Sequence, residues 1–351
     1  MKKICRVLAL IIVFSAGGVV RADDDVKFEF HGIIGTSTYY QSTPNFLLNG
    51  QGPLLVTSQS KQAPTFGADA RETRLSFAAI GHSIMNGATP RGFVEADFFG
   101  MNSPGSYGEV SVVPRLRLAF AELSWDHTIV RAGQDWQLLN ANAPLTLGHI
   151  AFPFYSAGFI GWREPGMGVF HTLDLGESKI EIAGQVLKSD WQSPYDFGLS
   201  TTNDKNVDFG QLSGEPGLEA RVKWTKDAHQ AYIVAHWNHV ASSQAPQLTN
   251  TGADTITASA TSLRDFDVLA VKVGGKTKIA NVTIQGEVYN GQNLGPLLGD
   301  LLQFPITNDV HEMGGWLQAG YSITEQWSTW GSFGTSRGRI LAMPQVPSKL
   351  V

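Results

Sequence analysis

The residues best suited to chemistry are arginines and carboxylates that alternate with apolar residues in one part of the chain. Arg115 and Arg117 are one residue apart in PRLRLAFAELSW, and Arg131 follows a tight turn in HTIVRAGQDW. Glu95 and Asp97 have the same spacing in RGFVEADFFG. A guanidinium group presents several N–H donors in a fork that fits a carboxylate. This set predicts either a site for anions or a ladder of ion pairs across strands.

Period-two alternation requires extended strands, with the charges on one face and the apolar residues on the other. Such segments recur along the chain. We count about thirteen of about ten residues each, the length of a tilted strand that crosses a bilayer. In order they are VKFEFHGIIG, RETRLSFAAI, RGFVEADFFG, PRLRLAFAELSW, HTIVRAGQDW, GMGVFHTL, KIEIAGQV, LEARVKW, AYIVAHWNH, FDVLAVKV, VTIQGEV, GGWLQAGYSI and QWSTWGSFG.

The connections between these segments alternate between long and short. Long ones include about 41–69, 137–162, 190–214, 242–262 and 290–310. Short ones are expected near 83–88, 126–127, 175–178, 226–228, 274–280 and 324–325. Long loops at one end and short turns at the other are typical of transmembrane β-barrels. The predicted fold class is therefore all-β, an antiparallel transmembrane β-barrel in one domain.

A barrel wall assigns the two faces of each strand to two solvents, because lipid covers the outside and water fills the lumen. Parity predicts that the following residues face lipid: Leu116, Leu118, Phe120, Val130 and Ala132. It predicts that the following face the lumen: Arg115, Arg117, Ala119, Arg131 and Asp135.

The first residues, MKKICRVLALIIVFSAGGVVRA, have the pattern of a secretory signal peptide. A charged start precedes an apolar run, and small residues stand where cleavage is expected. The competing interpretation, a membrane anchor, needs a run of about 20 apolar residues, and this run is shorter. We expect a signal peptide over 1–22 and one domain over 23–351.

Composition disfavours several kinds of site and partner. The only cysteine, Cys5, lies in the expected signal peptide, so a processed chain has no thiol chemistry and no cysteine metal site. Without Lys2, Lys3, Arg6 and Arg21, 22 basic residues face 31 acidic ones, a net charge of −9 that disfavours nucleic acid as a partner. After the signal peptide, no run of about 18 apolar residues predicts a membrane helix.

Four of the alternating runs resemble a known family. RETRLSFAAIG, GFVEADFFG, RLRLAFAELSW and VRAGQDW, within residues 70–136, are similar to the first strands of trimeric porins of Gram-negative outer membranes. They are most similar to the dicarboxylate-type (DcaP-like) group, in which an Arg-Leu strand, an E-x-D-F-F-G strand and an A-G-Q-x-W strand follow one another. The resemblance implies a 16-stranded barrel, a homotrimer, an outer-membrane location and outer-membrane lipid as a partner.

The strand count predicts that the chain is incomplete at its C-terminus. Single-chain bacterial barrels have even strand numbers, and about thirteen strands is three fewer than the porins that this sequence resembles. The tail RGRILAMPQVPSKLV shows no alternation. A miscount of the strands is the alternative.

In porins of this type the loop after the fifth strand folds into the channel and narrows it. Here that loop is QLLNANAPLTLGHIAFPFYSAGFIGW, which has no acidic residue and many aromatic ones. The resemblance implies a constriction formed by this loop and the charged wall. Its expected residues are Arg74, Glu95, Asp97, Arg115, Arg117, Arg131, Asp135, His149, Phe152, Phe154 and Tyr155.

The predicted function is passive diffusion of small hydrophilic solutes through a water-filled pore. Fixed charges in a narrow lumen select ions. The four wall arginines outnumber Glu72, Glu95 and Asp97, which favours anions and small carboxylates. No cofactor, metal or catalytic residue is expected, because His236 and His239 are three residues apart on a strand and face opposite sides. Two alternatives remain open: an outer-membrane barrel enzyme, and a soluble exported β-rich binding protein.

Overall fold

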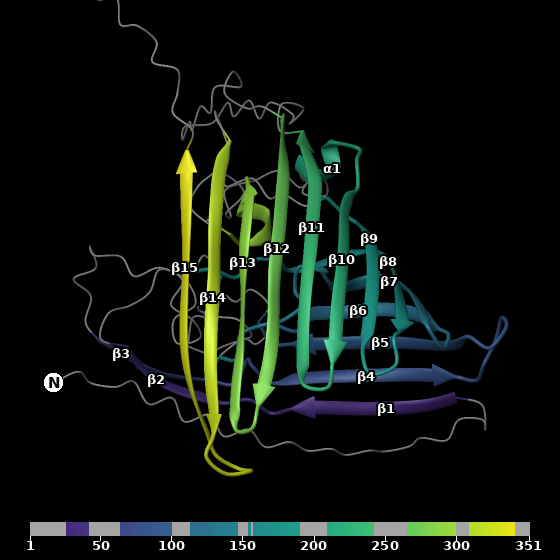
Figure 1. Cartoon of the computed structure of the whole chain (residues 1–351), viewed down its shortest axis with the longest axis horizontal. Helices are drawn as coiled ribbons and strands as arrows, with labels where there is room; N and C mark the ends of the chain where they lie inside the picture. Colours follow the sequence, from purple (N-terminus) through teal and green to yellow (C-terminus); the bar gives the residue numbers. More distant parts are fainter. Residues whose placement is uncertain are drawn as a thin grey trace, which may run out of the picture. The chain divides into compact units, whose positions relative to one another are not determined.

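The computed structural model describes residues 26–41, 64–99, 113–146, 154–155, 157–189, 209–241, 265–299 and 309–340. In these ranges thirteen strands form one antiparallel sheet in the order β1-β4-β5-β6-β7-β8-β9-β10-β11-β12-β13-β14-β15 (Figure 1). The all-β antiparallel fold class is confirmed, and each of the thirteen strands matches one of the predicted segments. None of the described helices is long and apolar enough to cross a membrane.

The strands have the following bounds: β1 Val26–Ile33, β4 Arg74–Gly81, β5 Thr89–Asp97, β6 Arg115–Ser124, β7 Thr128–Trp136, β8 Arg163–Asp174, β9 Lys179–Leu187, β10 Gly217–Lys226, β11 His229–Ala241, β12 Asp265–Ile279, β13 Val282–Gln292, β14 Val310–Ser322 and β15 Ser328–Ile340. Long and short connections alternate between them, as predicted. The short turns of β10 to β15 lie together at one end of these strands (Figure 1).

Several connections differ from the prediction. The stretch expected to be a long loop over 41–69 includes β3 (Thr65–Asp69), which pairs with β2 (Ser37–Gln41) in a separate two-stranded sheet. Both strands are short and far apart in the chain, so no local alternation shows that they pair. Further on, the long connections include the short helices α1 (Phe209–Leu212) and η4 (Gly295–Leu297).

The link expected at 274–280 is also wrong, because β12 continues to Ile279. Ile279 pairs with Val282, which leaves a turn of two residues. Gly274 and Gly275 interrupt the alternation in the sequence, yet both belong to the strand. A Cβ atom at Gly275 would lie 2.6 Å from the carbonyl oxygen of Gln230 on β11, so glycine permits this close approach.

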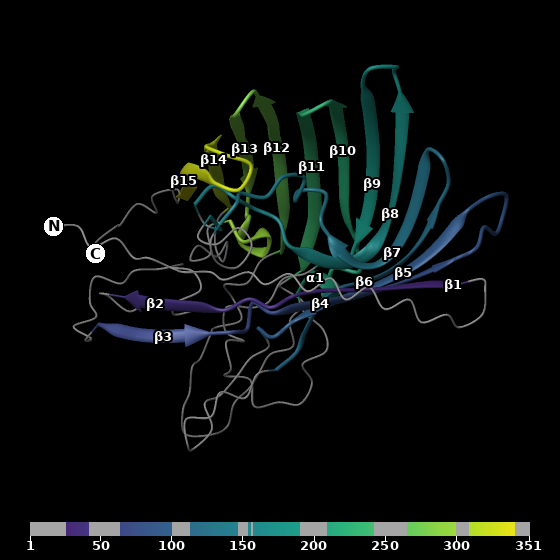
Figure 2. The ribbon, with the colours of Figure 1, turned by 90° about the horizontal axis from the view of Figure 1, so that it is seen from below.

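The chain divides into two compact units, which are described separately. Unit 1 comprises Met1–Trp136, Ala143–Tyr155 and Pro165–Leu173. Unit 2 comprises Gln137–Asn142, Ser156–Glu164 and Asp174–Val351. Strands β4 to β7 belong to unit 1 and are labelled in Figure 2. Strands β10 to β15 belong to unit 2.

In unit 1 a β-bulge in β6 changes which side chains share a face. Glu95 pairs with Leu118 and Ala96 pairs with Leu116, so Arg117 is an extra residue on β6. An extra residue reverses the alternation beyond it. Leu116 is half exposed, whereas Leu118 is buried.

The prediction that Leu118 and Phe120 face lipid is therefore wrong, and so is the inward assignment of Ala119. Phe120 pairs with Phe93 and the two rings stack 5.2 Å apart, on the face that carries the charged residues. Ala119 pairs with Val94, an exposed apolar residue. Val130 and Ala132 do lie on the predicted side, because Ala132 pairs with Ala121, which shares the face of Ala119.

In unit 2 the buried face of the sheet is polar and the exposed face is apolar. Ile233, Val271 and Leu317 are about half exposed, at 50%, 49% and 57%. The buried side chains of the other parity include the following: Gln185, Glu219, His236, Lys272, Gln285, Glu287, Glu312 and Gln318. This is the reverse of a soluble sheet, in which the apolar face is covered.

Candidate functional site

The charged residues of β4, β5 and β6 form a first charge network on the polar face of unit 1. Asp97 accepts hydrogen bonds from Arg115 Nη2 at 2.6 Å and from Arg117 Nη1 at 2.8 Å. Glu95 accepts one from Arg117 Nε at 2.6 Å, and Arg74 Nε lies 3.7 Å from the same carboxylate. The structure thus brings these predicted site residues together as a ladder of ion pairs.

A second charge network lies further along β5, β6 and β7. Arg131 Nε donates to Glu122 Oε2 at 2.9 Å, and Arg131 also forms an ion pair with Asp135. Arg91 Nη1 donates to the other oxygen of Glu122 at 3.4 Å. Arg131 and Asp135 were predicted as site residues, whereas Arg91 and Glu122 were not. Arg91 could have been found, since it has the parity of Glu95 in RGFVEADFFG.

Aromatic rings lie against the guanidinium groups of unit 1. The Cζ atom of Arg131 is 4.3 Å from the ring centroid of Phe120 and 5.3 Å from that of Phe170. The Cζ atom of Arg115 is 5.5 Å from the centroid of Phe99. Cations are attracted to the faces of aromatic rings. These contacts therefore help to fix the guanidinium planes.

The arginines of the first network differ in exposure. Arg117 is fully buried between its two carboxylates, whereas the side chains of Arg74 and Arg115 are 23% and 30% exposed. Arg131 of the second network is also 23% exposed. The alternative that the sequence left open, a ladder of ion pairs across strands, is what the structure shows, and Asp97 pairs with Arg117. Arg74, Arg115 and Arg131 thus keep part of their side chains accessible.

The A-G-Q-x-W run of β7 supports the bulge in β6. Gly133 has φ of 131°, and a Cβ atom there would lie 2.2 Å from the carbonyl oxygen of Ala119, so glycine is required. The side-chain amide of Gln134 donates to the carbonyl oxygen of Arg117 at 2.9 Å. The ring of Trp136 lies 5.9 Å from the Arg117 guanidinium. The motif therefore positions Arg117.

The loop between β7 and β8 is only partly described. His149 and Phe152 lie outside the described residues. Phe154 and Tyr155, in the part assigned to unit 1, are both buried. Of the four residues of this loop that were predicted for the constriction, the two described ones are packed among other atoms.

The loop residues that belong to unit 2 lie against the polar face of its sheet. The amide of Leu138 donates to Gln185 Oε1 at 3.2 Å and to Glu219. Arg221 Nη1 donates to the carbonyl oxygen of Leu138 at 3.1 Å. The side chains of Leu138, Leu139, Phe159 and Ile160 are buried. Gln185, Glu219 and Arg221 therefore hold this part of the loop against the sheet.

His236 and His239 have separate partners, as their spacing predicts. His236 Nδ1 is 2.9 Å from Glu219 and its Nε2 is 2.8 Å from Asn238 Oδ1, on the buried face. His239 Nδ1 is 2.8 Å from Asp267 Oδ1. Within the described ranges, no group of three or more His, Cys, Asp or Glu side chains could hold a metal ion.

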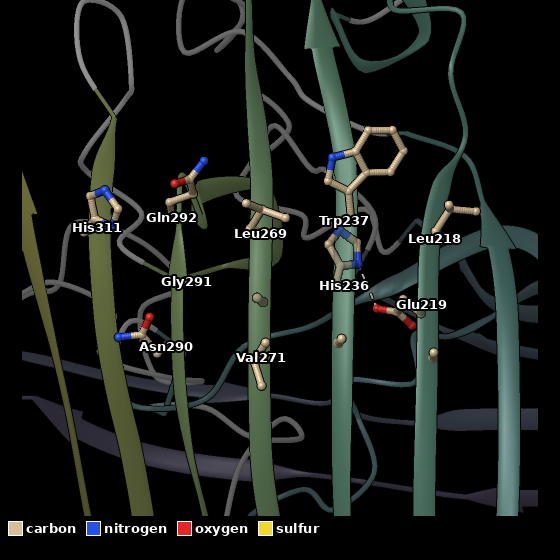
Figure 3. Close-up of a pocket in the computed structure, with 13 residues that line it drawn as sticks. Leu218, Glu219, His236, Trp237, Leu269, Val271, Asn290, Gly291, Gln292 and His311 are labelled. Carbon is tan, nitrogen blue, oxygen red and sulfur yellow. Dashed lines mark hydrogen bonds and ion pairs between the residues drawn. The ribbon is translucent and has the colours of Figure 1, made fainter.

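A groove of about 530 Å³ crosses β10 to β14. Figure 3 shows Leu218, Trp237 and Leu269 side by side on three neighbouring strands that line it. Leu218, Leu269 and Val271 are among the exposed apolar side chains of the sheet. The groove therefore opens mainly on the apolar face, and Glu219 and His236 also belong to its lining.

No family model matches the sequence, and no curated protein matches it either. Solved structures do match. The outer-membrane channel DcaP of Acinetobacter baumannii superposes with a TM-score of 0.65 and 14% identity, over 91% of this chain and 80% of that one.

Two other solved structures are similar at comparable coverage. The anion-selective porin from Comamonas acidovorans has a TM-score of 0.56 and 12% identity, over 90% of this chain and 80% of that chain. The outer-membrane protein OmpT of Vibrio cholerae has a TM-score of 0.51 and 10% identity, over 92% and 79%. The resemblance seen in the sequence is therefore borne out at the level of structure, and this chain has the fold of the outer-membrane porins.

Proposed function

We propose that this chain forms an outer-membrane channel through which small hydrophilic solutes diffuse passively, with a mild preference for anions such as small carboxylates. The observation that carries the proposal is the inverted sheet, whose apolar face is exposed and whose charged and polar face is covered. An exposed apolar face of this extent marks a surface that another apolar phase covers. Lipid against the apolar face and water against the polar face would suit both faces of the sheet, as in transmembrane barrels.

The polar face of unit 1 supports the anion preference. Five arginines face four carboxylates in the two charge networks, namely Arg74, Arg91, Arg115, Arg117 and Arg131 against Glu95, Asp97, Glu122 and Asp135. The partly exposed guanidinium groups are rigid because rings and carboxylates hold them, and their donor geometry suits carboxylates. One of the similar structures is that of a porin named as anion-selective.

The proposal includes features that rest on the sequence. They are export by a signal peptide over 1–22, a porin domain over 23–351, a constriction lined in part by residues 137–162, and assembly as a homotrimer. A passive channel needs no catalytic residue, metal or cofactor, and none is proposed.

Reversal potentials across a salt gradient in a planar bilayer test the ion preference. We expect the native protein to favour anions. Arg131→Gln should shift the reversal potential toward cation preference, because it leaves Glu122 and Asp135 on the polar face with one positive charge fewer. Lys226→Gln is the matched control, since Lys226 lies at a short turn and pairs with the exposed Glu177. Cation preference in the native protein, or equal shifts in both variants, would contradict the proposal.

A further inference from the structure

Lys272 is a fully buried lysine on the polar face of β12, and all three of its N–H donors are used. Its Nζ atom donates to Glu287 Oε1 at 2.7 Å, to the carbonyl oxygen of Ile160 at 2.8 Å and to that of Leu139 at 2.9 Å. The Phe159 ring centroid lies 4.8 Å from the same nitrogen. A buried ammonium group is costly unless it is paired and hydrogen-bonded. Here Glu287 supplies the opposite charge, and the two carbonyl oxygens accept the remaining hydrogen bonds.

The two carbonyl groups belong to the two arms of the loop between β7 and β8. One arm, 137–142, leaves β7, and the other, 157–162, leads into β8. The arms are bonded to each other, because Gln137 N donates to Trp162 O at 2.9 Å and Trp162 N donates to Gln137 Oε1 at 2.8 Å. A single ammonium group therefore binds both arms where they lie side by side.

The sheet fixes the position of Lys272 through its neighbours. Tyr232 on β11 donates its hydroxyl to Glu287 Oε2 at 2.6 Å, so both oxygens of this carboxylate are bonded. Gly274 on β12 lies beneath that tyrosine, and a Cβ atom there would lie 2.3 Å from the Tyr232 hydroxyl oxygen. Gly274, which interrupts the alternation in the sequence, is thus needed for the Tyr232–Glu287 hydrogen bond.

The second arm also contacts β14 and the helix η4 of unit 2. Gly158 has φ of 108°, and a Cβ atom there would lie 2.1 Å from the carbonyl oxygen of Gly315 on β14. Gly161 N donates to Leu297 O at 2.8 Å. These backbone contacts support the second arm alone, whereas Lys272 is bonded to both arms.

We propose that Lys272, held by Glu287 and Tyr232, is the positioning residue that fixes both arms of this loop and thereby keeps the channel in a single open state. This inference rests on the proposed function. Its physical basis is that Lys272 joins both arms to the wall, so the two arms cannot leave the wall while its hydrogen bonds to Leu139 and Ile160 remain. Loss of Lys272 should leave the sheet intact and free the loop to fluctuate.

Single-channel recording of Lys272→Met/Glu287→Gln tests the proposal. Both members of the buried ion pair become neutral, so no charge is left without a partner and the net charge of the wall is unchanged. We expect a folded, heat-modifiable protein that has lost the single steady conductance level and shows a noisy current. Lys226→Met/Glu177→Gln removes an ion pair of the same type at an exposed turn and should keep the native trace. A steady native trace in the first variant would overturn the proposal.

A second measurement does not depend on the folding of any variant or on conduction. Chymotrypsin cleaves after aromatic residues, and the second arm carries Phe159 and Trp162. In the folded native protein in detergent we expect no cleavage at these residues, as judged by mass spectrometry of the fragments. Cleavage after Phe159 or Trp162 would contradict the proposal that the loop is fixed to the sheet. Absence of any channel current from the native protein would instead refute the proposed function, and the protease result would still show whether the loop is anchored.

Discussion

Arg117 is the residue around which the first charge network is organised. It is fully buried, it is the extra residue of the β6 bulge, and it bonds both Glu95 and Asp97. A buried guanidinium group of this kind orders two carboxylates that would otherwise repel each other. Arg117 therefore holds the two carboxylates in place, while Arg115 and the other partly exposed arginines are those that the proposed channel would present to a solute.

Arg117→Met should destabilise the protein by about 3 kcal/mol, because removal of one partner leaves buried carboxylates without full compensation. Arg91→Met, at a partly exposed arginine with one carboxylate at 3.4 Å, should cost no more than about 1 kcal/mol. Urea unfolding of the detergent-solubilised protein measures both. Equal losses of unfolding free energy in the two variants would show that Arg117 has no special role.

At this scale the sequence predicts which residue types share a face more reliably than which residues pair. Arg74, Glu95 and Asp97 were placed together by parity alone. The pairing of Arg117 with both carboxylates depends on the bulge, and Gln134, which supports the bulge, carries no charge that would single it out. Lys272 was missed because Gly274 and Gly275 make its strand irregular. The alternation in VKV does indicate that the lysine lies on the face opposite to that of its two valine neighbours.

At the scale of the elements, strand existence follows from alternation, and the thirteen strands of the sheet were all predicted. Alternation does not show where a strand contains an extra residue, or where it continues through residues that break the pattern. The bulge in β6 and the extension of β12 to Ile279 both arise from close backbone contacts with neighbouring strands. The small sheet of β2 and β3 pairs two five-residue segments across a long connection, which local pattern cannot reveal.

The bulge predicts that the accessible face of β6 changes after Arg117. In a background with Cys5→Ser, a cysteine at Phe120 should react with a membrane-impermeant thiol reagent in intact outer-membrane vesicles, because that side chain lies on the polar face. A cysteine at the neighbouring Ala119 should not react, since it lies on the apolar face. The opposite pattern of labelling would restore uninterrupted alternation and remove the bulge.

At the scale of the whole molecule, the exposed face of the sheet is apolar and the buried face is polar. Exposed Ile233, Val271 and Leu317 need an apolar phase, whereas the covered glutamates, lysine and glutamines on the other side need water or one another. A soluble binding protein would bury the first set. An enzyme would need catalytic groups in a productive arrangement, which the channel proposal does not require. The central claim is therefore that water and small solutes pass along the polar face.

The most direct test of that claim is the current through the native protein in a planar lipid bilayer. The purified protein is first shown to be folded by its heat-modifiable migration, and it is then added at low concentration to one side of the membrane. We predict discrete upward steps of uniform size, because each insertion adds one water-filled pathway. Folded protein that inserts without producing any current step would contradict the account.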